Sequence, residues 1–135
     1  MMDIIFERNS FNETGEETTR TSFDCYFNGN IVGRIEIYVN KYFLRKQEIY
    51  IEVEREFRRQ GFAKLIYSNF LEKSVKLGFK KKTFYAVVNL NNKASLKLHT
   101  SLFPVCEITH LCKVFLIKKK NIVNIPSYEG THGIK

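Results

Sequence analysis

Two arginines, a glycine and a lysine stand close together in the segment EFRRQGFAKLIY, residues 56–67. Their types and spacing suit the binding of an anion at the start of a helix. The first turn of a helix presents unpaired backbone N–H groups and a partial positive charge, and a phosphate binds well there. Gly61 has no Cβ, so a phosphate can approach the backbone closely. The residues from Arg58 to Lys64 therefore predict a phosphate-binding turn.

Two common phosphate-binding loops do not match this segment. A Walker-type GxxxxGK is absent, since Gly61 is followed by Phe-Ala-Lys-Leu, and there is no GxGxxG. What remains is the pattern R-x-x-G-x-A, which runs from Arg58 to Ala63 and follows a strand ending at Val53.

Cys106, His110 and Cys112 form a second group with chemical potential. Structural zinc usually requires four ligands, with cysteines paired at C-x2-4-C spacing. Here the cysteines lie too far apart, and no fourth ligand is evident. We interpret them as buried strand residues and expect no metal.

Alternating and helical apolar patterns indicate the elements that carry these residues. We predict strands at residues 2–8, 22–28, 31–39, 47–54 and 83–88, one or two strands within 105–119, and helices at 60–77 and about 92–102. Residues 9–21 are polar and are predicted to form a loop. Asn28-Gly29 predicts a hairpin turn, because both residue types tolerate a positive φ.

The strand, helix and strand from residue 47 to residue 88 predict a right-handed βαβ unit with parallel strands. The second of these strands, TFYAVV, is nearly all apolar, which predicts burial on both faces. In such a unit ligands bind at the carboxyl ends of the strands. The sequence therefore predicts an α/β (α+β) fold with a mixed central sheet over residues 1–118, followed by a tail at 119–135.

The charge is divided unevenly along the chain. Residues 1–57 hold 11 acidic and 7 basic side chains, a net of −4, whereas residues 58–135 hold 3 acidic and 15 basic ones, a net of +12. The basic half favours an anionic partner and the acidic half a cationic one. The lysine clusters taken alone are better explained as solvated lysines at the ends of elements. The chain shows no signal peptide and no membrane span, and its three cysteines suit a reducing compartment, so we expect it in the cytoplasm.

Two motifs resemble a known family. VEREFRRQGFAKLIY, residues 53–67, resembles motif A of the GNAT superfamily of acyl-CoA N-acyltransferases, (R/Q)-x-x-G-x-(G/A) after a strand. NKASLKLHTSLF, residues 92–103, is similar to the family's second helix, N-x-x-(S/A)-x-x-L-(Y/H)-x-x-L-G-F. The matching positions in this second segment are Asn92, Ser95, Leu98, His99, Leu102 and Phe103. The resemblance covers residues 31–103.

Two departures from the family pattern concern the turn after the second helix and the acceptor side. The glycine expected before Phe103 is missing, and the sequence Leu102-Phe103-Pro104 stands in its place, so this turn must differ. Family members usually carry two helices between the first two strands, and the polar residues available here are too few for two packed helices. We therefore expect the acceptor side to be open or to be completed by another subunit, as in a homodimer.

The resemblance implies a site for acetyl-CoA, with the pyrophosphate on the backbone N–H groups of the turn and the pantetheine arm paired with the preceding strand. Asn92 would help to hold this arm, and it would also serve as an ordinary helix N-cap. The predicted cofactor-binding residues are Ile51, Glu52, Val53, Arg58, Arg59, Gln60, Gly61, Phe62, Ala63, Lys64, Asn92 and Ser95.

Three side chains are candidates for catalysis by the same resemblance. Glu52 and Glu48 are candidate bases for the amine, which must lose a proton before it attacks; they could equally be solvent-facing strand carboxylates. The Val53 backbone N–H is the candidate oxyanion donor. His99 occupies a position that is commonly a tyrosine in the family and would protonate the leaving thiolate. It could also be a polar helix residue that faces water.

The predicted function is transfer of an acetyl group from acetyl-CoA to a primary amine, on a small cationic molecule or on a protein. Two alternatives stay open. The basic half could bind RNA, as in toxin-like enzymes that acetylate aminoacyl-tRNA, with activity falling as salt increases. A GNAT-shaped module that has lost catalysis could instead bind nucleic acid or a protein partner.

Overall fold

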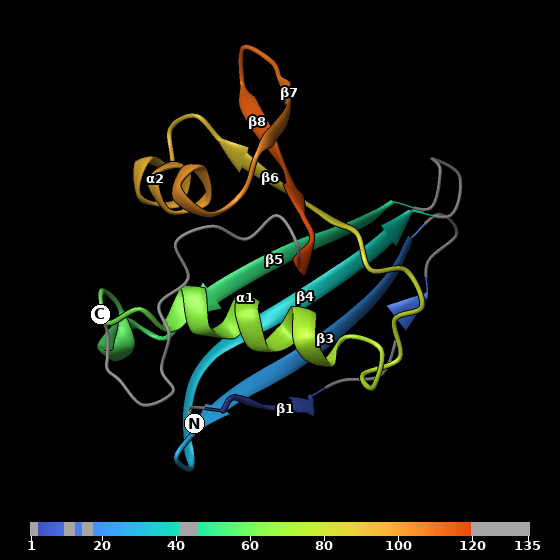
Figure 1. The fold of residues 1–135 in the computed structure, drawn as a ribbon, viewed down its shortest axis with the longest axis vertical. Helices are drawn as coiled ribbons and strands as arrows, with labels where there is room; N and C mark the ends of the chain where they lie inside the picture. Colours follow the sequence, from blue (N-terminus) through green and yellow to red (C-terminus); the bar gives the residue numbers. More distant parts are fainter. Residues whose placement is uncertain (1–2, 10–12, 15–17, 41–45, 120–135) are drawn as a thin grey trace.

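The computed structural model describes residues 3–9, 13–14, 18–40 and 46–119, and Figure 1 shows them as one sheet with two helices. The strands follow the order β1-β3-β4-β5-β6-β8-β7, and β2 pairs with β3. The strands are β1 (Ile5–Arg8), β2 (Glu13–Thr14), β3 (Thr18–Phe27), β4 (Asn30–Asn40), β5 (Gln47–Val53), β6 (Phe84–Asn89), β7 (Val105–Ile108) and β8 (Cys112–Ile117). The helices are α1 (Phe62–Lys73), α2 (Lys93–Leu102) and a single 3-10 turn, η1 (Arg55–Phe57). The mixed α/β prediction is confirmed.

A tight turn joins the two long strands β3 and β4. Asn28 has a φ of 51° and Gly29 a φ of 82°. Two successive positive φ values match the right-handed twist of an antiparallel hairpin, which is why the Asn-Gly pair predicted this turn correctly. β4 continues antiparallel to β5, with Arg34 opposite Glu52 and Tyr38 opposite Glu48.

β5 and β6 are the parallel strands of the predicted βαβ unit, but they pair only where Glu48 lies opposite Tyr85. β6 then continues antiparallel to β8. In Figure 1 β6 runs away from β5 towards α2, so the two strands separate at the carboxyl end of β5. Among the described residues, no strand pairs with the last residues of β5 on that side.

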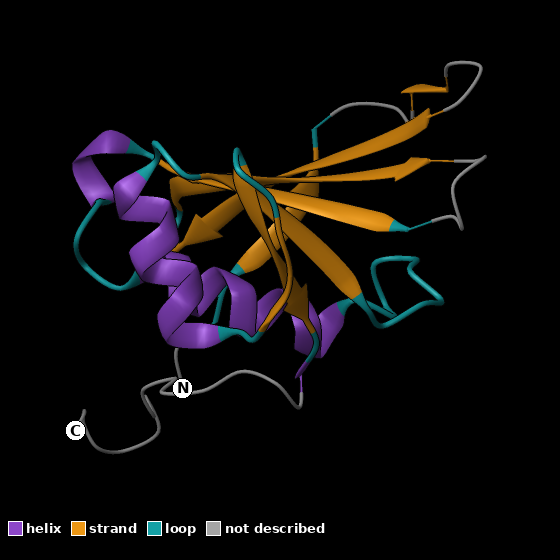
Figure 2. Ribbon diagram, turned by 90° about the horizontal axis from the view of Figure 1, so that it is seen from above, coloured by secondary structure: helices purple, strands orange, loops and turns teal. Residues whose placement is uncertain are grey.

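The apolar core lies between the sheet and the two helices. The inward residues of β4 and β5, such as Ile35, Ile37 and Ile49, are almost fully buried, and so are Ile66 and Phe70 of α1. In Figure 2 the helices lie on one side of the strands, and within the described residues no helix crosses the other side. The outward face of β4 and β5 is therefore uncovered by helices.

Several boundaries differ from the sequence prediction. α1 begins at Phe62, because the residues before it form a turn rather than a helix. It ends at Lys73, and the chain then turns to Gly78, whose φ is 105°. This turn closes with a hydrogen bond from the Phe79 N–H to the Ser74 carbonyl of 3.0 Å.

Two further predictions about the strands were wrong. The segment 9–21 contains β2 and the first residues of β3, because cross-strand pairing overrides its polar composition. β6 alternates between buried and more exposed residues, with Val87 37% exposed, so it is not buried on both faces. The predicted tail, apart from Lys119, lies outside the described residues.

Candidate active site

The turn before α1 exposes the helix N-terminus without a side-chain cap. Arg59 and Gly61 have φ values of 65° and 84°. Gly61 is the N-cap residue, and no side chain of the described residues caps the first turn with a hydrogen bond. The first backbone bond into the helix runs from the Leu65 N–H to the Gly61 carbonyl, 3.2 Å. The N–H groups of residues 62–64 therefore have no acceptor within the helix and can bind an anion.

The carboxyl end of β5 presents backbone groups to the same region. The Glu54 N–H donates to the Val32 carbonyl at 2.8 Å, on the β4 side. Because successive residues of a strand direct their backbone groups to opposite sides, the Val53 N–H and carbonyl lie on the β6 side. Arg58 Nε donates to this Val53 carbonyl at 2.9 Å, which agrees with that direction. β6 no longer pairs with β5 here, so within the described part of the chain no strand accepts the Val53 N–H.

A cavity of about 730 Å³, here called the cofactor cavity, joins these elements. Every predicted cofactor-binding residue except Gln60 lines it, and the Gln60 side chain instead donates to the Glu56 carbonyl at 3.0 Å. The lining residues are Ile51, Glu52, Val53, Phe57, Arg58, Arg59, Gly61, Phe62, Ala63, Lys64, Asn92, Ala94, Ser95, Leu98 and His99. The predicted set of cofactor-binding residues omitted Phe57, Ala94 and Leu98, which also line the cavity.

Asn92 stands at the start of α2, on the far wall of the cofactor cavity. Its side-chain oxygen accepts a hydrogen bond of 3.2 Å from the Ser95 N–H, so it is an N-cap. The residue is exposed and lines the cavity. Its capping role therefore leaves the amide nitrogen of Asn92 available to a ligand.

His99 is a buried residue of α2, with only 4% of its surface exposed, so it does not face water. Its Nδ1 lies 2.8 Å from the Ser95 carbonyl oxygen, which can only accept, so Nδ1 carries the proton. Nε2 lies 2.7 Å from the hydroxyl of Tyr67 and accepts its hydrogen bond. Burial lowers the pKa of His99, although the Ser95 bond opposes this effect. The imidazole is therefore held neutral at neutral pH.

The buried imidazole makes the stability of the fold depend on pH. As the pH falls through about 6.5, the ordinary pKa of histidine, His99 binds a proton in the unfolded chain but stays neutral in the folded protein. We expect the free energy of unfolding to fall by up to about 1.4 kcal/mol per pH unit from there down to the lowered pKa. His99→Gln, which cannot titrate, should lose less stability than the parent between pH 7.5 and 5.5 in urea titrations. Equal losses in the two proteins would contradict this prediction.

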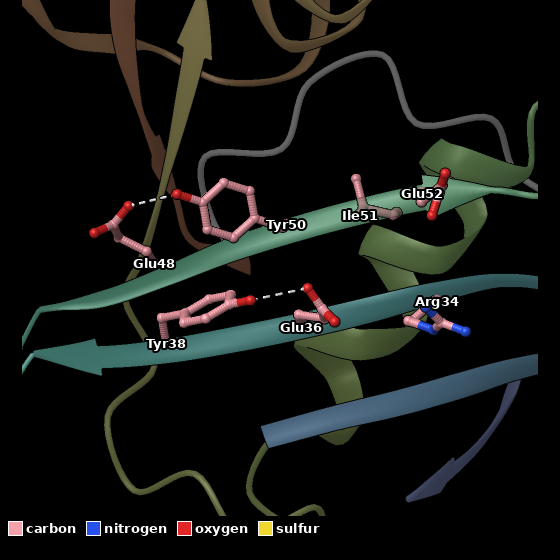
Figure 3. A pocket seen from close by; sticks show the side chains of 7 residues that line it. All are labelled: Arg34, Glu36, Tyr38, Glu48, Tyr50, Ile51 and Glu52. Carbon is pink, nitrogen blue, oxygen red and sulfur yellow. Dashed lines mark hydrogen bonds between the residues drawn. The ribbon is translucent and has the colours of Figure 1, made fainter. Parts of the chain in front are cut away.

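A second hollow, here called the acceptor groove, lies on the outward face of β4 and β5 and has a volume of about 470 Å³. Figure 3 shows its side chains, with Glu48 and Glu52 at opposite ends and the two tyrosines between them. The Tyr50 hydroxyl donates to Glu48 at 2.9 Å, and the Tyr38 hydroxyl donates to Glu36 at 3.2 Å. The lining residues are Arg34, Glu36, Tyr38, Glu48, Tyr50, Ile51 and Glu52.

The two hollows meet at the end of β5, because Ile51 and Glu52 line both of them. Glu48 lines only the acceptor groove, four residues earlier on the same face of the strand. The two candidate bases therefore have different surroundings, and only Glu52 touches both hollows.

Gly33 of β4 is a further residue that sequence reasoning missed. A Cβ at this position would lie 2.5 Å from the Glu52 carbonyl oxygen and 3.3 Å from the Val53 Cα. No side chain fits between β4 and this end of β5. The absent side chain at Gly33 therefore sets the position of the backbone that faces the cofactor cavity.

Gly33→Ala should shift the end of β5 and destabilise the fold. Overpacking of this kind typically costs about 1–3 kcal/mol of unfolding free energy. We expect a lower midpoint in urea unfolding, together with weaker acetyl-CoA binding by calorimetry, because Glu52 and Val53 must move. A Gly33→Ala protein with the parent's stability and affinity would show that a Cβ at position 33 fits between β4 and β5.

The remaining reactive side chains do not form a site in the described residues. Within them, no three His, Cys, Asp or Glu residues are grouped so as to hold a metal ion. All three cysteines are free. The prediction of buried strand cysteines was wrong for Cys106, which is exposed on the edge strand β7, and Cys112 is only partly buried. Of the helices described, neither α1 nor α2 has the length and hydropathy of a membrane span.

Together these features describe an enzyme site: an uncapped helix N-terminus and two separating strands beside a cavity, adjoining an acidic groove. The model of the acetyltransferase (GNAT) family matches residues 3–103. The chain therefore belongs to the acetyltransferase (GNAT) family. It is an acyl-CoA N-acyltransferase, and acetyl-CoA is the co-substrate of this enzyme class. No curated protein is significantly similar to it in sequence.

Solved structures of N-acetyltransferases share the fold. A variant of spermidine N-acetyltransferase SpeG from Vibrio cholerae is 20% identical with a TM-score of 0.60, over 78% of this chain and 67% of that chain. N-acetyltransferase PseH from Campylobacter jejuni, in complex with acetyl coenzyme A, is 19% identical with a TM-score of 0.56, over 74% and 68%. A chimera of the Vibrio cholerae enzyme and hSSAT is 14% identical with a TM-score of 0.62, over 87% and 96%.

Proposed function

We propose that this enzyme transfers the acetyl group of acetyl-CoA to the primary amine of a cationic acceptor. One observation carries the proposal. The cofactor cavity and the acceptor groove meet at Ile51 and Glu52, beside the Val53 N–H, which points to the β6 side of β5. A thioester that lies in the first hollow is then within reach of an amine that lies in the second.

The cofactor is held mainly by backbone groups in this proposal. The pyrophosphate binds the free N–H groups of the first turn of α1, where Gly61 leaves room for it. Arg59 and Lys64 line the same part of the cavity and add positive charge. The pantetheine arm lies in the gap between β5 and β6 and pairs with β5 as an additional strand would.

The transfer begins when the amine loses a proton, because an alkyl ammonium has a pKa of about 10.4. Of the two candidate bases, Glu52 lies nearer to the cofactor cavity, and it accepts this proton directly or through a water molecule. The amine nitrogen then attacks the thioester carbon, and the negative charge that develops on the carbonyl oxygen is stabilised by the Val53 N–H. The carbon–sulfur bond breaks, the nitrogen loses its second proton to water and becomes the amide, and the coenzyme leaves as a thiolate that takes up a proton.

His99 is the candidate donor of that last proton, since it lines the cofactor cavity. Donation requires the imidazolium form and the release of the Tyr67 hydroxyl from Nε2. Burial lowers the pKa of His99, so this form is a minor one at neutral pH. The part of the rate that depends on His99 should therefore increase as the pH falls.

The acceptor is expected to be cationic because the groove carries three glutamates, Glu36, Glu48 and Glu52, against one arginine, Arg34. An ammonium group is attracted to such a surface. The free state of all three cysteines supports a reducing cytoplasm as the place of the reaction.

Calorimetry with acetyl-CoA, followed by release of the free thiol in the presence of a panel of primary amines, tests the proposal. We expect micromolar to millimolar binding of acetyl-CoA and thiol release that depends on the amine. Absence of binding at millimolar acetyl-CoA, or release that no amine accelerates, would contradict the proposed function.

A further inference from the structure

The acceptor groove has a charge pattern that is more specific than a general attraction for cations. Glu36 forms an ion pair with Arg20 of 3.3 Å, and Arg34 forms one with Asp24 of 3.7 Å. These groups therefore compensate one another on the β3 and β4 side of the groove. The free negative charge lies along β5.

Glu48 and Glu52 carry that free charge. Among the ion pairs between described residues, none includes either of these two carboxylates. Glu52 is exposed, and Glu48 is partly exposed and accepts only the neutral Tyr50 hydroxyl, which leaves its charge uncompensated. Two unpaired carboxylates on one face of one strand repel each other unless cations bind beside them.

The strand determines the separation of the two carboxylates. Residues four apart on a strand lie on the same face, with Cα atoms about 13 Å apart. The glutamate side chains can lean towards each other, so two cations bound to them would be separated by roughly 8 to 13 Å.

The floor between the two carboxylates is aromatic. The rings of Tyr38 and Tyr50 are in edge contact, with centroids 5.3 Å apart, and Tyr50 is 43% exposed. In Figure 3 both rings lie between Glu48 at one end and Glu52 at the other. Such a surface packs well against methylene groups and tolerates a nearby cation.

We infer that the acceptor is a linear aliphatic amine with a second ammonium group at the far end of its chain. The inference rests on the proposed function and specifies its substrate. The reacting amine lies at Glu52, because only that end adjoins the cofactor cavity. The methylene chain lies over Tyr50 and Tyr38, and the distal ammonium binds Glu48.

The length of the acceptor follows from the spacing of the carboxylates. An extended alkyl chain gains about 1.3 Å per methylene, given C–C bonds of about 1.5 Å. A separation of roughly 8 to 13 Å therefore corresponds to about six to ten methylenes, or to a chain of that length with an internal amine.

Rates with α,ω-diamines of about four to twelve carbons, each compared with the monoamine of equal length, test the inference. The measured quantity is the ratio of kcat/KM for the diamine to kcat/KM for the monoamine. A charge-assisted hydrogen bond is worth about 10- to 100-fold. We expect the ratio to reach that range at about six to ten methylenes and to be lower for shorter and longer chains.

Glu48→Gln separates the anchoring role of Glu48 from a role as base. Loss of an anchor lowers the diamine-to-monoamine ratio towards one, whereas loss of a base lowers both rates and leaves the ratio unchanged. Glu107→Gln is the matched control, because it removes an equal charge from an exposed position on β7, several strands away. It should leave the ratio as in the parent.

Three outcomes would overturn the inference while leaving the proposed function intact. The first is that monoamines are acetylated as fast as diamines of every length. The second is that the diamine-to-monoamine ratio is the same in Glu48→Gln as in the parent. The third is that Glu107→Gln lowers this ratio as much as Glu48→Gln does. If no amine is acetylated at all, the proposed function itself fails, and the two failures are therefore distinguishable.

Discussion

Gly61→Glu is expected to abolish measurable acetyl-CoA binding. Gly61 caps α1 with a φ of 84°, and the N–H groups of the three residues after it have no acceptor among the described residues. A carboxylate at this position would occupy the place of the pyrophosphate and repel it. Two like charges about 4 Å apart near a protein surface interact by about 4 kcal/mol. We therefore expect the calorimetric Kd to rise at least about 100-fold.

Gly78→Glu provides the matched control for this change. Gly78 also has a positive φ, 105°, and no atom lies within 4 Å of the position of its Cβ. Both variants should lose a similar stability, because a non-glycine residue in the left-handed region costs about 1–2 kcal/mol. Only Gly61→Glu should lose the cofactor. Unchanged affinity in a folded Gly61→Glu protein would show that the pyrophosphate binds elsewhere.

His99→Ala is expected to lower kcat and kcat/KM together, with acetyl-CoA affinity nearly unchanged. A proton donor acts only as the carbon–sulfur bond breaks, so its loss affects the transition state and not cofactor binding. General acid catalysis is typically worth about 10²–10⁴-fold, and the loss of rate should fall in this range. Thiol release with a working amine measures it.

Two further variants separate chemistry from packing, because His99 is buried and alanine leaves a hole in its place. Tyr67→Phe keeps the imidazole and removes only the 2.7 Å hydrogen bond to Nε2. It should retain much more activity than His99→Ala. His99→Tyr should recover part of the rate and move the alkaline limb of the pH profile upward, since a phenol ionises near 10. Parental turnover by folded His99→Ala between pH 6 and 9 would remove His99 from the mechanism.

Much of the fold was predictable because its signals are local. The Asn28-Gly29 turn, the alternation along β5 and the helical spacing in α1 each depend on residues that are neighbours in the chain. The turn before α1 was predictable for the same reason, since Gly61 and the arginines around it lie within a few residues, and its binding of phosphate stays a prediction. The end of α1 was misjudged by four residues because apolar residues continue past Lys73, although Val75 is 59% exposed.

The candidate catalytic residues were recognised by type, but their environments were not. His99 was expected either to protonate the leaving thiolate or to face water. It is buried against Tyr67 of α1, and it also lines the cofactor cavity. The two residues are 32 positions apart, so no local pattern indicates their contact. The need for glycine at position 33 was not predicted, because the atoms that leave no room for a Cβ there belong to β5, the neighbouring strand.

The sequence by itself determined the glycine turn before α1 and the alternation that puts Glu48, Tyr50 and Glu52 on one face of β5. These follow from backbone geometry over a few residues. Only the tertiary structure decided which residues of other strands and helices lie next to the turn and to this face of β5. The register of β4 against β5 placed Tyr38 beside Tyr50 and Arg34 opposite Glu52. The separation of β6 from β5 exposed the Val53 N–H. Strand pairing and helix packing join residues that are distant in the chain, and such contacts depend on the whole fold.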